Sequence, residues 1–199
     1  MDRSEAVSSH TNSLPFKEEL TNRLVEMGGS EVVVKELLLK EGYFFSSESI
    51  QNLVMVLSIY RKIQLTHDCI FFIYGSTARG TAKAGERIQE FQFWEGERFL
   101  GSCFRRRGGS DIDLRIIAQN RDEIHHSLEI VRQDLKQSRS VRIELRIDDP
   151  TYVAWETTRA DTSSFFRRVL TLNQPLVLHG RKELECITKL AYSHLTPED

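Results

Sequence analysis

Two aspartates, Asp111 and Asp113, lie one residue apart in the segment 109–117, which otherwise has the pattern of a buried strand. Because successive side chains of a strand point to opposite faces, the two carboxylates share a face and lie about 6.6 Å apart. Carboxylates at this spacing repel each other unless a cation lies between them, and magnesium-type ions bind one or two carboxylates together with substrate phosphates. The pair is therefore a candidate metal site, although an isolated pair of this kind is more often a strand edge with two solvated acids, and the neighbouring motifs decide between the two.

A continuous apolar run, 69–74, ends abruptly at Gly75 and Ser76. The pattern predicts a buried strand, a tight turn and the start of a helix. Gly75 would let a ligand approach the backbone, and Ser76 would cap the helix and offer a hydroxyl. Backbone amides at a helix start suit a phosphate, and Arg79 would add positive charge one turn later. Turns of this kind also occur for packing reasons alone.

A third segment, 141–148, again alternates apolar and charged residues and places Glu144, Arg146 and Asp148 on one face of a predicted strand. If this strand neighbours the strand of Asp111 and Asp113, Glu144 completes a cluster of three carboxylates. Three acids beside a phosphate-binding turn are what a two-metal transfer site requires. Taken alone, Glu144 is more simply interpreted as a solvated acid on an amphipathic strand, and the other two motifs reverse that preference.

Together these motifs resemble the signature of the DNA polymerase beta-like nucleotidyltransferase superfamily. The resemblance extends from Ile70 to Gly180, and it rests on Gly75-Ser76, on Asp111-Ile112-Asp113 and on Glu144. It implies an α/β (α+β) core in which helices flank a mixed β-sheet. Most members have aspartate at the third acidic position, although glutamate occurs.

The resemblance implies that a nucleoside monophosphate is moved from a nucleoside triphosphate such as ATP to a hydroxyl, with release of pyrophosphate. By position, Asp111, Asp113 and Glu144 would be the catalytic residues and would ligate Mg²⁺, with Mn²⁺ as a substitute. The nucleotide would be bound by Gly75, Ser76, Arg79 and Ser110.

The chain is too short for the separate domains of processive polymerases, so an RNA end or a protein side chain is the expected acceptor. Alternatives are an antibiotic-type small-molecule acceptor, or a catalytically silent module that binds a nucleotide or a partner. An unrelated α/β metal-dependent hydrolase is a further reading of the aspartate pair.

One departure from the superfamily is large, because 35 positions separate Ser76 from Asp111. The segment 86–107 fills most of this distance, and Glu95-Gly96-Glu97 lies between two aromatic-rich arms. This pattern predicts an inserted β-hairpin with a short turn. The hairpin could cover the nucleotide or contact the acceptor, and a tolerated surface insertion is the alternative.

The composition is that of a compact soluble protein with 199 residues, 40% of them hydrophobic and 28% charged. No apolar run has the length of a membrane span and no signal-peptide pattern is present, so we expect a cytoplasmic protein without membrane partners. A net charge of −2 does not indicate nucleic-acid binding by the chain as a whole. Three scattered cysteines indicate thiols, because their spacing fits neither a disulfide framework nor a zinc site.

Three parts are expected along the chain: a disordered tail (1–14), a helical N-terminal extension (15–66) and a nucleotidyltransferase core (67–199). Glycines and serines delimit the predicted helices of the extension, since both are common at helix ends. The predicted helices are 16–27, 31–40, 46–64, 121–136, 162–173 and 181–192, and a short strand is expected over 152–155.

Overall fold

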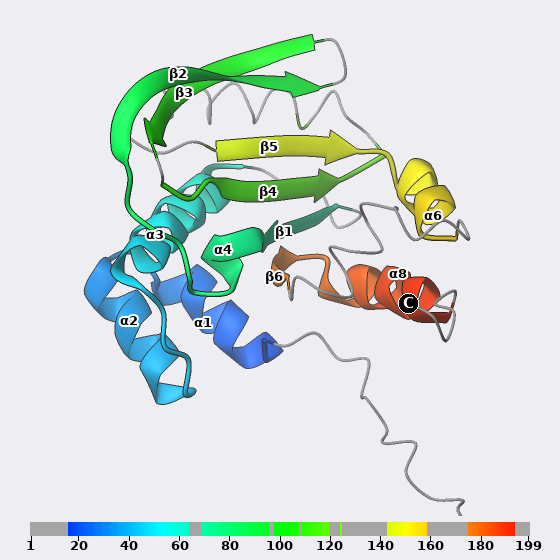
Figure 1. Cartoon of the computed structure of the whole chain (residues 1–199). Helices are drawn as coiled ribbons and strands as arrows, with labels where there is room; N and C mark the ends of the chain where they lie inside the picture. The colour runs from blue at the N-terminus through cyan, green and yellow to red at the C-terminus, as the bar shows by residue number, and fades with distance from the viewer. Residues whose placement is uncertain are drawn as a thin grey trace, which may run out of the picture.

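The computed structural model describes residues 16–63, 69–95, 98–107, 109–119, 124, 143–158 and 175–193, with only the backbone described for 86–95, 98–107 and 191–193. A four-stranded mixed sheet is flanked by helices, as the sequence predicted (Figure 1). The predicted tail 1–14 and the predicted helix 162–173 lie outside the described residues. So does the predicted helix 121–136, apart from Ile124, which is helical and buried.

The N-terminal extension forms α1 (Glu18–Met27), α2 (Glu31–Lys40) and α3 (Ser47–Lys62), close to the predicted ranges. The side chain of Ser30 caps α2 by accepting the Val33 amide hydrogen bond, and Ser46 caps α3 in the same way. Each cap satisfies a backbone amide that has no partner inside the helix.

The sheet contains β1 (Ile70–Tyr74), β4 (Ile112–Ile117), β5 (Ile143–Asp148) and β6 (Leu176–His179). Its strand order is β5-β4-β1-β6. Strand β1 pairs antiparallel with both β4 and β6, whereas β4 and β5 run parallel. Three of these strands follow the predicted apolar patterns, while β6 was not assigned from the sequence.

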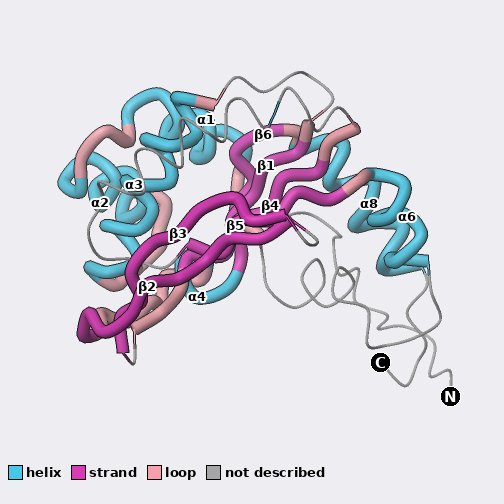
Figure 2. The backbone as a smooth tube through the Cα atoms, turned by 90° about the horizontal axis from the view of Figure 1, so that it is seen from above, coloured by secondary structure: helices cyan, strands magenta, loops and turns pink. Residues whose placement is uncertain are grey.

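Helices cover both faces of the sheet, and each face has its own apolar cluster (Figure 2). On one face, α1, α2 and α3 pack against Phe71, Ile73 and alternate residues of β4 and β5. On the other face, Phe72, Tyr74 and Ile117 pack with residues of α6 (Pro150–Thr158) and α8 (Arg181–Ser193). The helical extension is therefore one layer of the folded core.

The predicted hairpin is present as β2 (Glu86–Glu95) and β3 (Arg98–Arg107), which pair antiparallel in a separate two-stranded sheet. Figure 1 shows it beyond the β5 edge of the main sheet, and β2 lies beside β5. The insertion thus lies next to the strand that carries Glu144.

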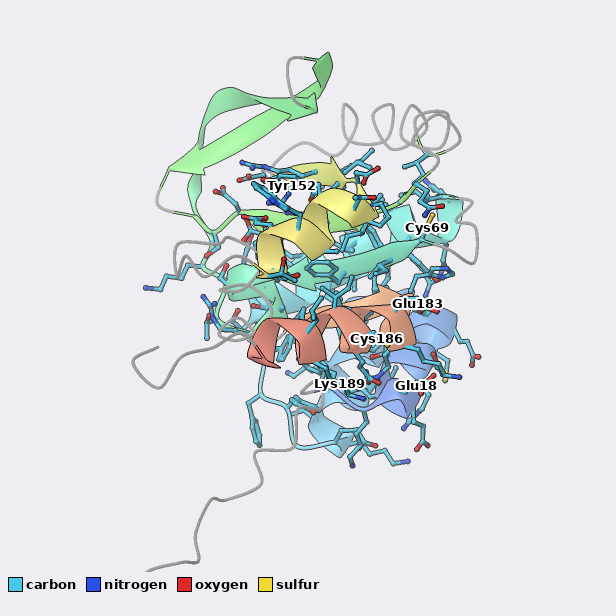
Figure 3. The ribbon with its side chains drawn as sticks, turned by 90° about the vertical axis from the view of Figure 1, so that its right-hand side faces the viewer. Glu18, Cys69, Tyr152, Glu183, Cys186 and Lys189 are labelled. Carbon is cyan, nitrogen blue, oxygen red and sulfur yellow. The ribbon has the colours of Figure 1, made fainter. Side chains whose placement is uncertain are left out.

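The predicted strand 152–155 was wrong, because these residues belong to α6. Tyr152, Val153 and Trp155 have side chains that favour strands. Asp149 and Pro150 instead favour the start of a helix. The Asp149 carboxylate accepts a hydrogen bond from the Thr151 amide at 2.7 Å, and proline suits the first position of a helix. Figure 3 looks onto α6 and α8, with Tyr152 on the first and Cys186 on the second.

Among the described residues, none of the helices has the length and apolar character needed to cross a membrane.

Candidate active site

Two of the predicted acidic residues lie side by side in the sheet. In the parallel register of β4 and β5, Asp113 is the partner of Glu144, and on its other side Asp113 is the partner of Tyr74 of β1. The flanking residues of β4 and β5 point into the cluster beneath α1, α2 and α3, so the two carboxylates are on the opposite face. Tyr74, Asp113 and Glu144 therefore form one row across three strands.

The turn after β1 lies directly against this row. The chain passes from Tyr74 into α4 (Gly75–Ala78), and Gly75 has a positive φ of 70°. A β-carbon at this position would collide with the Asp113 carboxylate and lie 3.1 Å from its Cγ. Glycine therefore allows both the backbone conformation and the close approach of the carboxylate.

One expectation for this turn was wrong. Ser76 does not cap a helix, because α4 already begins at Gly75 and its N-cap residue is Tyr74. The helix is a single turn that ends at Ala78, so Arg79 lies after it, exposed at its C-cap. Any phosphate bound here would meet the amides and the Ser76 hydroxyl of a short turn, without the dipole of a long helix.

The other predicted residues lie where the chain enters β4. Asp111 and Ser110 are both half-buried and directly precede the strand. The Ser110 hydroxyl accepts a hydrogen bond from the Lys83 amide at 2.9 Å, and the Ser110 amide donates to the Lys83 carbonyl at 2.9 Å. Ser110 therefore joins the start of β4 to the segment that follows α4.

A buried ion pair lies further along the same face. The guanidinium of Arg115, which is 2% exposed, contacts the Asp148 carboxylate at 2.6 Å. It also lies over the Tyr74 ring, 5.9 Å from the centroid. A buried guanidinium needs such partners, because an unpaired buried charge is costly. The sequence placed Asp148 on this face but did not indicate that Arg115 pairs with it.

Burial raises the pKa of Tyr74 to about 12. The charge of Arg115 and its hydrogen bond to Tyr74 lower the pKa, whereas the nearby Asp113 and Glu144 carboxylates raise it. The hydroxyl of Tyr74 is therefore neutral at physiological pH and lies within the electrostatic field of the row.

The three predicted acidic residues are of a type that suits a hard divalent cation, because Asp111, Asp113 and Glu144 offer only carboxylate oxygens. The position of Gly75, whose missing side chain leaves space for the Asp113 carboxylate, is consistent with this reading. The Glu144 carboxylate, however, contacts Arg146 at 2.7 Å. Within the described part of the chain, no group of three or more histidine, cysteine, aspartate or glutamate side chains is arranged to hold a metal ion.

Two features gave no signal in the sequence. The first is a set of hydrogen bonds between polar side chains at the start of α3 and the turn after β1.

The second is a cavity of about 250 Å³, which lies where residues of α1 meet the end of β6 and the start of α8. It includes Tyr60, whose hydroxyl lies 3.2 Å from Nδ1 of His179, and Glu18, labelled in Figure 3. Neither the row of carboxylates nor the turn contributes to its lining.

Comparison with known proteins gives no relative: no protein-family model, curated protein or solved structure matches this chain.

Proposed function

We propose that this protein is a metal-dependent nucleotidyltransferase, which transfers a nucleoside monophosphate from a nucleoside triphosphate to a hydroxyl acceptor. The observation that carries the proposal is the alignment of Asp113 with Glu144 across β4 and β5, with the Gly75 turn directly against Asp113. Residues that are 31 positions apart in sequence are thereby joined to a turn whose first backbone amides have no partner within the helix. Acidic oxygens and phosphate-binding amides in one place suit the substrate of this reaction.

Asp111, Asp113 and Glu144 are the residues that would hold magnesium. When bound, the ion would stabilise the negative charge of the triphosphate and favour ionisation of the attacking hydroxyl. Glu144 would exchange its contact with Arg146 for this role. Arg146 is more than half exposed, so losing that contact costs little.

The reaction exchanges one phosphorus–oxygen bond for another. The acceptor oxygen attacks the α-phosphorus, the bond from that phosphorus to the β-phosphate breaks, pyrophosphate leaves, and the hydroxyl proton passes to solvent. The amides of the turn and the Ser76 hydroxyl would hold the triphosphate in line for this displacement. Arg79, which is exposed next to the turn, would meet the outer phosphates.

As the acceptor we favour an RNA end or a protein side chain. The hairpin of β2 and β3 lies beside β5, so an acceptor bound along the hairpin would be near Glu144. This position agrees with a role of the insertion in acceptor binding.

The experiment is transfer from each α-labelled nucleoside triphosphate, with Mg²⁺ or Mn²⁺, in a cell lysate that supplies acceptors. Products are separated into protein, RNA and small-molecule fractions. The proposal expects label in one fraction with the wild type and none with Asp113→Asn. Label that is equal for both proteins would refute the assignment of the site.

A second candidate function is a catalytically silent module that binds a nucleotide. The contact between Glu144 and Arg146 favours it, because an acid engaged in an ion pair is less accessible to a cation. Tight nucleotide binding by the purified protein without transfer to any fraction, and with no effect of Asp113→Asn, would favour this candidate.

A further inference from the structure

The start of α3 is bonded to the turn that follows β1. Ser46, Ser49 and Asn52 are spaced three residues apart and therefore lie on one side of the helix. This side faces residues 75–82, which we call the glycine turn, and each of the three residues makes a hydrogen bond to it. The contact joins the helical extension to the candidate active site.

Four hydrogen bonds make this connection. The Ser46 amide donates to the Gly80 carbonyl at 2.8 Å, and its hydroxyl donates to the Ala82 carbonyl at 2.7 Å. The Ser49 hydroxyl accepts from the Ala82 amide at 2.9 Å. The Asn52 side-chain amide donates to the Thr77 hydroxyl at 3.2 Å. The glycine turn is thus tied to α3 at Thr77 and again at Gly80 and Ala82.

The capping of α3 does not require these bonds. The Ser46 hydroxyl already satisfies the helix by accepting from the Ser49 amide at 3.1 Å. Ser49 and Asn52 are fully buried, and Thr77 is 1% exposed, so their polar groups have been removed from water. Apolar side chains in these places would avoid that cost.

The free-energy cost of burying polar groups is clearest at Asn52. Its amide nitrogen binds Thr77, but its buried Oδ1 has no hydrogen-bond partner. A buried carbonyl without a partner destabilises the fold, and such an exception calls for a specific explanation. An apolar side chain with the same branching, such as leucine, would not have this unpaired oxygen.

The aromatic ring before α3 adds a steric contact. Gly80 has a positive φ of 74°, and a β-carbon there would lie 2.5 to 2.9 Å from three atoms of the Phe45 ring. The glycine turn is therefore fixed at Gly75 by the Asp113 carboxylate and at Gly80 by Phe45. Between these points lie the amides and the Ser76 hydroxyl assigned to the triphosphate.

We propose that Ser49 and Asn52 are positioning residues for the nucleotide, which hold the glycine turn in the conformation that binds the triphosphate without touching the triphosphate themselves. This inference rests on the proposed function, because it concerns the same site. It makes the N-terminal helical extension a part of the nucleotide-binding apparatus.

The test compares Asn52→Leu and Ser49→Ala with a matched control, Ser58→Ala, which changes an exposed serine of the same helix. Asn52→Leu removes the unpaired oxygen but also leaves the buried Thr77 hydroxyl without this bond, and because the two effects oppose each other the urea midpoint is expected to change little. Ser49→Ala is the smaller change, and it keeps the test decisive if Asn52→Leu does not fold.

Two measurements are made on each full-length variant. The first is hydrogen exchange of the amides of residues 77–82 without nucleotide, which should be faster in both test variants. The second is the affinity for the magnesium complex of a non-hydrolysable ATP analogue, which should weaken by about 3- to 10-fold, the effect of losing one hydrogen bond. In transfer assays, KM for the nucleotide should rise and kcat should not change.

Unchanged exchange in the glycine turn would overturn the inference, and so would faster exchange with unchanged affinity. An equal loss of affinity in Ser58→Ala would also overturn it, because the effect would then not depend on contact with the turn. Failure of the proposed function would be seen in the wild type itself, which would then transfer no label from any of the four nucleoside triphosphates even where it binds them.

Discussion

The carboxylate of Asp113 lies in the space that a side chain at position 75 would occupy, so Gly75 and Asp113 fit only as a pair. The antiparallel register of β1 and β4 places Tyr74, the residue before Gly75, opposite Asp113. The end of one strand and the acid of the next are therefore in direct contact. This contact connects the part of the site that suits phosphate with the part that suits a cation.

Gly75→Ala is expected to destabilise the protein and to displace the Asp113 carboxylate. The new methyl group has to tolerate a φ of 70° and also collides with Asp113. Gly42→Ala is the matched control, because Gly42 has a φ of 82° and nothing within 4 Å of the added carbon. Strain alone should cost about 1 kcal/mol of unfolding free energy in the control, and Gly75→Ala should cost more.

Urea unfolding measures the loss of unfolding free energy in each variant. Nucleotide affinity is a second measurement that distinguishes the two variants. Gly42→Ala should leave affinity as in the wild type, whereas Gly75→Ala should weaken it. Equal losses of stability and equal affinities for the two variants would show that the contact between Gly75 and Asp113 is unimportant.

Asp113→Asn and Glu144→Gln are expected to reduce transfer by at least about 100-fold while leaving the fold intact. Each substitution removes a negative charge without changing the shape of the side chain, and the proposed cation depends on that charge. The control is Glu183→Gln, which changes an exposed glutamate in the first turn of α8 and should leave the activity normal. Circular dichroism checks the fold of each variant, and normal transfer by either acidic variant would exclude a metal role for that residue.

Much of this arrangement was predictable because strands that bury one face repeat their pattern every second residue. The alternation around Asp113 and around Glu144 predicted two strands and the face on which each acid lies. It could not predict the parallel pairing of Asp113 with Glu144, since partner strands and register depend on the three-dimensional course of the chain. From the sequence, it followed only that Glu144 would join the other acids if the two strands were neighbours.

Two other features of the structure were not predicted from the sequence, for physical reasons that can be identified. Tyr152 and Trp155 suggested a strand because their own preferences were given more weight than the helix-start signal of Asp149 and Pro150. The contact between Asn52 and Thr77 gave no signal at all. A polar residue on a helix usually faces solvent, and its burial becomes evident only when the helix is packed on the sheet.

Asp148→Ala is expected to cost about 3 to 5 kcal/mol of unfolding free energy, because it removes the carboxylate that contacts Arg115 and leaves a buried guanidinium with one partner fewer. Arg146→Ala is the contrasting change. It removes an ion pair of 2.7 Å, but its side chain is 55% exposed, so the expected cost is below about 1 kcal/mol. Urea unfolding of the two variants gives both values. Similar costs would mean that burial does not distinguish the two ion pairs.

Stability is expected to fall at alkaline pH because of Tyr74. The pKa of the Tyr74 hydroxyl is 10.0 in the unfolded chain and about 12 in the folded chain. Below pH 10 the hydroxyl is therefore protonated in both states. Between these values the unfolded chain releases the proton first, so rising pH favours unfolding. A difference of two pKa units corresponds to a loss of roughly 3 kcal/mol at most.

The measurement is urea unfolding between pH 9 and pH 12 in the presence of a chelator, for wild type and Tyr74→Phe. The variant has no hydroxyl to ionise at this position, so its stability should fall less steeply with pH than that of the wild type. Tyr152→Phe, which changes an exposed tyrosine, should keep the slope of the wild type. If Tyr74→Phe also kept that slope, the buried hydroxyl beside Arg115 could not be the group that titrates.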